Sequence, residues 1–105
     1  MSKLQLLLTL WAGHYLADYP LQGEFIAKTK EQIFRTSDGF HTLTAHAFIH
    51  GLVVGTITHS FGAGLFIAVT HWVIDAGKAR FNLYGIDVDQ ALHFIMIVIV
   101  AMRLS

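Results

Sequence analysis

The sequence predicts an all-α protein, a bundle of four short transmembrane helices with a short amphipathic interfacial helix between the first two. Composition, the spacing of the apolar segments and a polar pattern inside them all favour this fold. Hydrophobic residues make up 54% of the 105 positions and charged residues 13%, and the mean hydropathy is +0.56. A soluble domain typically carries about 25% charged residues. We therefore expect one membrane domain covering residues 1–105.

Composition also excludes some classes of partner and site. Seven basic and seven acidic residues cancel, so nothing in the charge balance favours a nucleic acid partner. The absence of cysteine excludes disulfides and thiolate metal sites. Lys3 and the apolar run after it resemble the start of a secretory signal. No small-x-small cleavage site follows, so we expect this segment to be retained as the first helix.

The first helix is expected at about 3–19. Pro20 ends it, because proline cannot continue a helix. At ~1.5 Å per residue it spans roughly 25 Å, which is short for crossing a bilayer. In the polar connection that follows, residues 23–34 place a few apolar side chains among charged ones. This pattern predicts the amphipathic helix that lies at the membrane interface.

The second and third helices are expected at about 42–59 and 65–80, separated by a tight glycine-rich turn at 60–64. Gly51 and Gly55 form a small-xxx-small pair, which lets membrane helices approach closely. We therefore expect the second helix to pack tightly against a neighbour.

Residues 82–85 then break the chain, and the fourth helix is expected at about 88–102. Asp87, followed three residues later by Gln90, resembles a capping box at its start. Residues 94–101 are apolar on every face. A helix of a soluble bundle would need a polar face toward water, so this segment favours the membrane fold.

Each predicted span carries one pair of ionisable side chains spaced i, i+4, which places both on one helix face. The pairs are His14/Asp18, His46/His50, His71/Asp75 and Asp89/His93. Roughly one such pair is expected by chance from this composition. Every pair lies near the end of its span that meets one of the two polar connections, so all four should lie at one membrane depth.

Ionisable groups within a span cost a few kcal/mol or more unless they are paired, solvated or bound to metal. Five imidazoles and three carboxylates suit zinc best, or manganese or iron, in one or two closely spaced sites. Alternatives stay open for each pair. Asp18 would otherwise be solvated at the interface, and Asp89 would stabilise a helix N-terminus through the helix dipole. The two central pairs would form structural hydrogen bonds. His41 and His59 lack an i+4 partner and are expected at the interface.

Together these motifs resemble a known family. They are His14-Tyr-Leu-Ala-Asp18 with Gln22, Ala45-His46-Ala-Phe-Ile-His50, Thr70-His71-Trp-Val-Ile-Asp75 with Lys78, and Asp89-Gln90-Ala-Leu-His93. They are similar to motifs of domain-of-unknown-function family 3307, small membrane proteins of bacteria and phages, over nearly the whole chain. The resemblance adds Gln22, Lys78 and Gln90 as residues that face a substrate, or else cap helices or anchor them at the interface.

The leading functional hypothesis is a membrane-embedded, metal-dependent hydrolase that acts on a lipid or other membrane-associated substrate. The metal would activate a water molecule, and Asp18 or Asp75 would act as the general base. One alternative is a metal-ion or proton transport or relay protein. Another is a structural or interaction module held together by its metal. A homo-oligomer remains open.

The distribution of basic residues predicts an orientation. Five lie on the side of the polar pairs, and two lie on the other side. The first group is Lys28, Lys30, Arg35, Lys78 and Arg80, and the second is Lys3 and Arg103. By the positive-inside rule, the polar pairs would lie toward the cytoplasm in a bacterial inner membrane.

Overall fold

The structure is a computed structural model that describes residues 2–19, 21–81 and 85–104, apart from the side chains of residues 27, 31, 80, 81, 86, 87 and 104. Its elements, in chain order, are α1 (Lys3–Asp18), α2 (Gly23–Thr29), the 3₁₀ turn η1 (Lys30–Gln32), α3 (Ser37–Thr58), α4 (Phe61–Phe81) and α5 (Ile86–Leu104). No strand occurs in the described residues. The predicted all-α class is confirmed.

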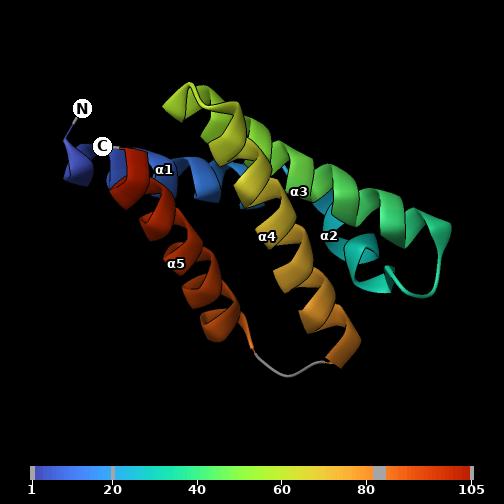
Figure 1. The fold of residues 1–105 in the computed structure, drawn as a ribbon. Helices are drawn as coiled ribbons and strands as arrows, with labels where there is room; N and C mark the ends of the chain where they lie inside the picture. The colour runs from blue at the N-terminus through green and yellow to red at the C-terminus, as the bar shows by residue number, and fades with distance from the viewer. Residues whose placement is uncertain (1, 20, 82–84, 105) are drawn as a thin grey trace.

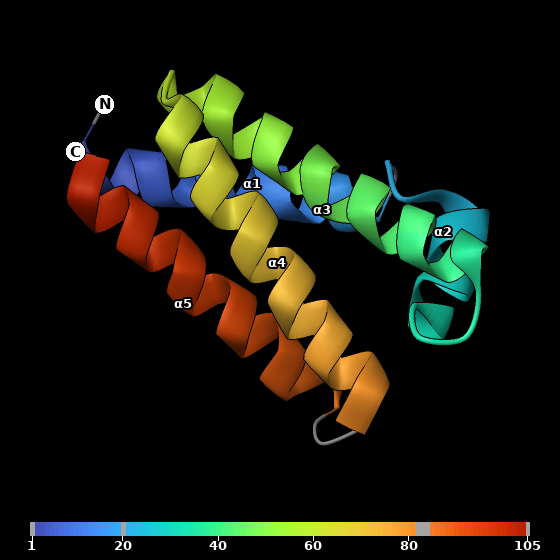
Figure 2. The ribbon, with the colours of Figure 1, turned by 45° about the vertical axis from the view of Figure 1, so that its right-hand side comes forward.

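Helices α1, α3, α4 and α5 form an elongated bundle with extents of 42 × 23 × 22 Å (Figure 1). The chain termini lie together at one end of it, and α2 and η1 pack beside the first half of α3 near the other end (Figure 2). Helix α3 contacts α1, α4 and the α2–η1 segment, whereas α5 packs on α1 and α4. Helix α3 is therefore the central element of the fold.

Helix α3 begins at Ser37, so the expected start at residue 42 was wrong. The hydroxyl of Thr36 accepts a hydrogen bond from the Gly39 amide at 2.9 Å and caps the helix. Such a cap satisfies a backbone donor that has no partner within the helix. A stretch that the sequence pattern assigned to the connection is therefore the first turn and a half of the central helix.

The predicted turn at 60–64 was also wrong, because α4 already begins at Phe61. His59 takes the left-handed conformation with φ 54° and ends α3, a position that usually favours glycine. The hydroxyl of Ser60 accepts a hydrogen bond from the Ala63 amide at 3.1 Å and so caps α4. The reversal between the two helices is therefore complete within two residues.

The glycines of this region serve helix packing. A Cβ atom on Gly51 would lie 2.6 Å from the backbone oxygen of Gly64, and one on Gly64 would lie 2.7 Å from the oxygen of Gly51. A Cβ on Gly55 would meet Gly64 at an ordinary 3.5 Å. The close approach predicted from Gly51 and Gly55 is confirmed, and Gly64 supplies the facing surface on α4.

The other helix ends differ less from expectation. Helix α1 ends one residue early, at Asp18, and α5 begins two residues early, at Ile86. Pro20, the break at 82–84 and the side chain of Asp87 lie outside the described residues. The amphipathic segment is not one helix over 23–34, because the chain tightens into the η1 turn and buries Ile33 against Leu43.

Among the described helices, one, Ser37–Thr58, has the length and apolar composition needed to cross a membrane. Helix α1 is shorter, with 16 residues, and α4 carries Asp75 and Lys78 in its second half. A buried helix of a soluble protein would meet the same criterion. The fold itself therefore establishes an all-α bundle, and four membrane crossings remain a proposal.

Candidate metal centre

The four long helices each direct one i, i+4 pair into the interior of the bundle. These are His14 and Asp18 from α1, His46 and His50 from α3, His71 and Asp75 from α4, and Asp89 and His93 from α5. The five imidazoles are 0–4% exposed. The structure therefore brings the four predicted pairs together in one polar cluster.

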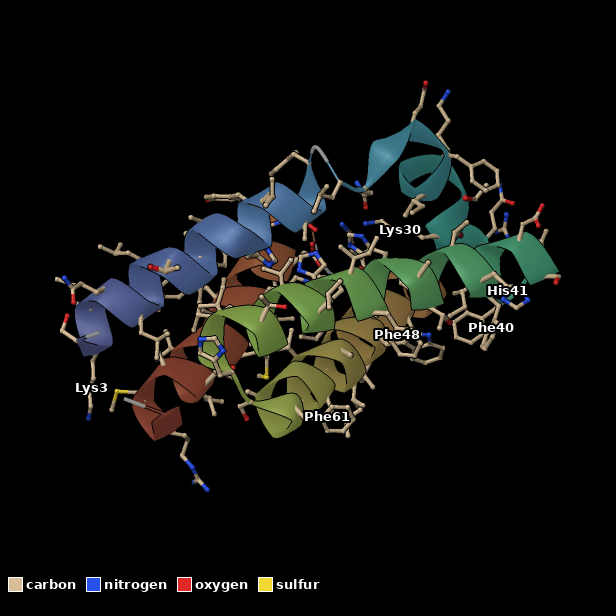
Figure 3. The ribbon with its side chains drawn as sticks, turned by 90° about the horizontal axis from the view of Figure 1, so that it is seen from above. Lys3, Lys30, Phe40, His41, Phe48 and Phe61 are labelled. Atoms are coloured by element: carbon tan, nitrogen blue, oxygen red, sulfur yellow. The ribbon has the colours of Figure 1, made fainter. Side chains whose placement is uncertain are left out.

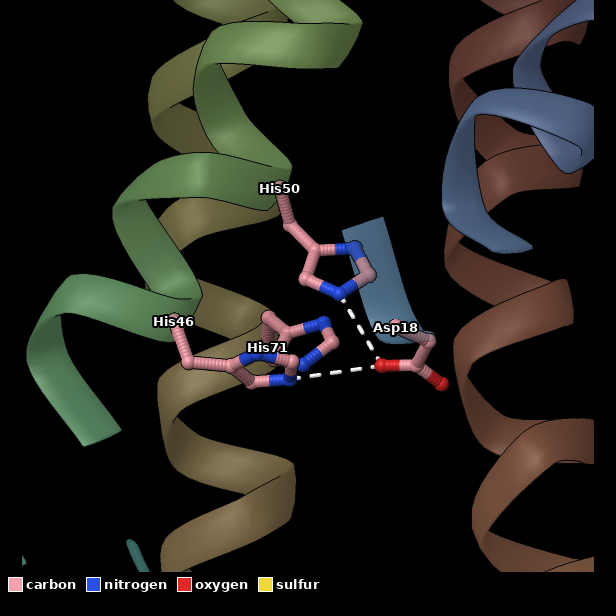
Figure 4. Close-up of side chains that lie close together, drawn as sticks. All are labelled: Asp18, His46, His50 and His71. Carbon is pink, nitrogen blue, oxygen red and sulfur yellow. Dashed lines mark hydrogen bonds and ion pairs between the residues drawn. The ribbon is translucent and has the colours of Figure 1, made fainter. Parts of the chain in front are cut away.

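One half of the cluster is built around the carboxylate of Asp18. Its Oδ1 atom lies 3.1 Å from Nε2 of His50 and 3.3 Å from Nε2 of His46, as the dashed lines in Figure 4 show. His71 of α4 completes this group, whose ligand atoms all lie within 4.8 Å of one another. Three helices thus bring one carboxylate and three imidazoles to a single point.

The other half is built around Asp75. Its Oδ2 atom lies 3.2 Å from Nε2 of His71, and its Oδ1 atom lies 3.2 Å from Nε2 of His93. His71, Asp75 and His93 form a second group within the same 4.8 Å limit, so His71 belongs to both groups. The His71 ring is stacked between those of His50 and His93, with centroid distances of 3.8 and 4.0 Å.

The donor set fits a divalent metal ion. Nε2 of His71 and Oδ2 of Asp75 are buried without a hydrogen-bond partner in the described part of the chain, although they lie 3.2 Å apart. A buried polar atom without a partner costs about 1–3 kcal/mol, and coordination to an ion would satisfy both atoms. Imidazole and carboxylate ligands suit zinc, manganese or iron.

Two of the eight predicted ligands lie just outside these groups. Nε2 of His14 lies 3.4 Å from Oδ2 of Asp18, and its ring is stacked on Trp11 at 4.5 Å. Oδ1 of Asp89 lies 3.5 Å from Nε2 of His93 and has no hydrogen-bond partner among the described residues. Both residues lie next to the centre, and neither belongs to one of the two groups.

Gln90, expected at a substrate or at a helix cap, joins two helices at the edge of the centre. Its Nε2 atom donates to Oδ2 of Asp18 at 2.9 Å, and its Oε1 atom lies 2.9 Å from Nε2 of His14. The amide therefore holds the α1 pair against α5. Metal sites depend on such supporting contacts to orient their ligands.

Lys30 is a residue of the centre that sequence reasoning missed. Its Nζ atom lies 3.4 Å from Nε2 of His46 and 3.9 Å from Oδ2 of Asp75. It also donates to the side chain of Gln22, whose amide donates to the Asp18 carbonyl at 2.9 Å. Figure 3 shows Lys30 between the α2–η1 segment and α3. Because its place depends on how η1 packs, no spacing rule could have found it.

A polar cavity of about 440 Å³ opens beside the Asp75 half of the centre. Its charged lining residues are Lys28, Lys30, Arg35, Lys78, Asp75 and Asp89. Nζ of Lys78 lies 3.8 Å from Oδ2 of Asp89. The cavity reaches the centre through Asp75 and Asp89, whereas Asp18 does not line it.

His41 and His59 are exposed and join neither group.

Comparison with known proteins agrees with the motif pattern. No curated protein and no solved structure matches the chain. The family model described as "Protein of unknown function (DUF3307)" matches residues 6–105, a range that includes all four His/Asp pairs. The resemblance seen in the motifs is therefore confirmed, and the chain belongs to the DUF3307 family.

Proposed function

We propose that the protein is a membrane-embedded, metal-dependent hydrolase that acts on a lipid or another membrane-associated substrate. The observation that carries the proposal is the pair of overlapping, buried His/Asp groups beside a polar cavity. A purely structural metal site is closed by its protein ligands, whereas a catalytic site needs access for water and substrate. The cavity next to Asp75 supplies that access.

The polarity of the bundle supports a membrane location. On α3, His46 and His50 are buried, whereas Phe48 and Leu52 are 63% and 69% exposed. Phe61, at the start of α4, is 85% exposed, and Figure 3 shows it projecting outward. Large apolar side chains on the outside suit lipid tails. We infer that the four long helices cross the bilayer and that lipid is the contacting partner.

The two His/Asp groups described above are the sets that would hold the ions. His71, Asp75 and His93 are one set, and Asp18, His46 and His50 with the shared His71 are the other. A bound divalent metal, most simply zinc, would polarise the substrate and lower the pKa of a water molecule. The supporting residues His14 and Gln90 would keep Asp18 oriented.

The general base is best assigned to Asp89. The sequence favoured Asp18 or Asp75 for this role, but the oxygens of both face imidazoles within 3.4 Å. Asp89 lines the cavity and lies outside both groups, and its nearest imidazole nitrogen, Nε2 of His93, is farther away, at 3.5 Å. A base must lie within hydrogen-bond reach of the proton that it takes, and Asp89 faces the space in which water and substrate would meet.

A transport pathway through one chain is disfavoured by the other end of the bundle. There, Leu6, Leu10, Val54, Ile67 and Ile97 belong to one apolar core. A route for ions or protons needs polar groups or water along its length. The polar cluster instead ends at this core, as expected for a site that is entered from one side.

The basic residues support a cytoplasmic entrance. Lys28, Lys30, Arg35 and Lys78 line the cavity, whereas Lys3 lies at the opposite end of the molecule (Figure 3). Cytoplasmic segments of membrane proteins carry the excess of lysine and arginine. We therefore infer that the cavity opens to the cytoplasmic side of a bacterial inner membrane.

The proposal is tested by metal analysis of protein purified in detergent without a histidine tag. Wild-type protein should carry one or two equivalents of zinc, manganese or iron by mass spectrometry, and the His71→Ala/His93→Ala double variant should carry none. The matched control is His41→Ala/His59→Ala, which also removes two histidines but at exposed positions. A wild-type protein that stays metal-free after incubation with these ions would overturn the proposal.

A further inference from the structure

We propose that the polar cavity binds a phosphate group, which makes the substrate a phosphate ester. The inference rests on the proposed function, because it names the substrate class of the same site. Three features of the cavity favour a phosphate: the charges that line it, the number of hydrogen-bond donors that they offer, and the short distance from Lys30 to the metal centre.

The lining charges favour an anion. Four cationic side chains face two carboxylates around the cavity. Three of these cations lie near a carboxylate: Lys30 lies 3.9 Å from Asp75, Lys78 lies 3.8 Å from Asp89, and Lys28 pairs with Glu24 at 2.8 Å. Arg35 has no ion-pair partner in the described part of the chain. A divalent metal at the centre would add further positive charge, so the cavity has an excess of positive charge to balance.

The number of donors favours phosphate over a carboxylate. Each lysine ammonium has three N–H donors and each arginine guanidinium has five. Lys30 already donates to Gln22, but the N–H groups of Arg35 and Lys78 together still require more acceptor atoms than the two oxygens of a carboxylate. A phosphate group offers three or four oxygens, and arginine pairs with it through two parallel hydrogen bonds. The volume of about 440 Å³ leaves room for the organic part of the ester.

Lys30 connects the cavity to the metal centre. Its Nζ atom lies 3.4 Å from Nε2 of His46 and 3.9 Å from Oδ2 of Asp75, and the same side chain lines the cavity. A phosphate bound by Lys30 would therefore border both ligand groups. In hydrolysis, the water oxygen bonds to phosphorus while the P–O bond to the organic group breaks. The proton that water loses passes through Asp89 to the leaving oxygen, which gives an alcohol and a free phosphate.

The first test measures binding of radiolabelled inorganic phosphate to the metal-loaded protein in detergent by equilibrium dialysis. Replacing two cavity cations, in Arg35→Gln/Lys78→Gln, should weaken binding at least about tenfold, because each charge-assisted hydrogen bond contributes substantially. Lys3→Gln/Arg103→Gln is the matched control at the opposite end. Equal binding by both double variants would overturn the inference.

A second arm distinguishes a lipid from a soluble phosphate ester. Phosphatidic acid in mixed micelles and glycerol phosphate in solution would each be tested for displacement of the labelled phosphate, with phosphatidylcholine as the micelle control. Displacement by phosphatidic acid at the lower concentration identifies a lipid substrate, and displacement by glycerol phosphate identifies a soluble one. Displacement by neither would contradict a phosphate-ester site.

Two measurements separate this inference from the proposed function. Metal content is determined in every sample, so unchanged metal with unchanged phosphate binding in the cavity variant rejects the phosphate site alone. Absence of metal rejects the hydrolase instead.

Wild-type protein provides a test that does not depend on variants. Phosphate should slow acetylation of Lys30 and Lys78 but not of Lys3, as measured by peptide mass spectrometry, and equal rates at all three would overturn the inference.

Discussion

The two ends of the bundle are built from the same four helices, but the interior of one end is apolar and that of the other is polar. Toward the termini, Leu10, Val54 and Ile97 form an aliphatic core of 0–2% exposed side chains. Toward the α2–η1 segment, the same helices hold imidazoles that are 0–4% exposed, together with carboxylates that are somewhat less buried. The difference indicates a division into two roles. The apolar end holds the four helices in place, and the polar end positions metal ligands on these helices.

The boundary between the two ends is narrow on every helix. On α4, Ile67 of the apolar core and His71 of the polar cluster are one turn apart, and on α3 the close contact at Gly51 directly follows His50. Helix packing at the boundary therefore determines the distances between ligands on α3 and α4. If this division holds, substitutions on the two sides should have separable effects on metal affinity and on stability.

The largest effect is expected at His71, the ligand shared by both groups. His71→Ala alone should lower metal affinity more than about 100-fold, since replacing even supporting residues of a metal site costs 10–100-fold. Ile67→Ala, one turn earlier on the same face, should keep the metal. Competition with a chelator, read by mass spectrometry, measures both. Equal metal retention by the two variants would contradict the division.

Leu10 tests the apolar end. Leu10→Ala should lower the free energy of unfolding by about 2–5 kcal/mol, because it leaves a cavity in a fully buried site. The metal content of the folded fraction should stay at the wild-type value. The measurement is a denaturation curve in mixed micelles, with Leu8→Ala, at a 60% exposed position, as the control. Loss of metal from folded Leu10→Ala would show that the two ends are not separable.

Gly51, at the boundary, should affect both properties. Gly51→Ala places a Cβ atom 2.6 Å from the Gly64 oxygen and should cost about 1–3 kcal/mol of stability through overpacking. It should also weaken metal binding, because it moves α3 away from α4 next to His50. Gly62→Ala, where the nearest atom is 3.9 Å away, should be neutral or stabilising, since alanine favours a helix more than glycine. Thermal unfolding and metal content are measured on both.

The sequence predicted the polar end better than the helix ends. Spacing of four residues fixes a face, and the two connections fix which helix ends meet, so the convergence of His14, His46, His71 and His93 could be derived. The starts of α3 and α4 could not, because Ser, Thr and Gly residues suit both a turn and a capped or closely packed helix. Lys30 was missed because it lies in an irregular segment whose position depends on tertiary packing.

The smallest effect is expected at Gln90, which supports ligands without joining either group. Gln90→Ala removes its contacts to Asp18 and His14 and should lower metal affinity about tenfold with little change in stability. Gln5→Ala is the matched glutamine substitution at the other end of the bundle. It breaks the capping box between Ser2 and Gln5 at the start of α1, so it should destabilise the fold by about 1 kcal/mol or less and leave affinity unchanged. The opposite outcome, with affinity sensitive to Gln5 and not to Gln90, would show that the ligands are oriented by helix stability and not by the contacts around them.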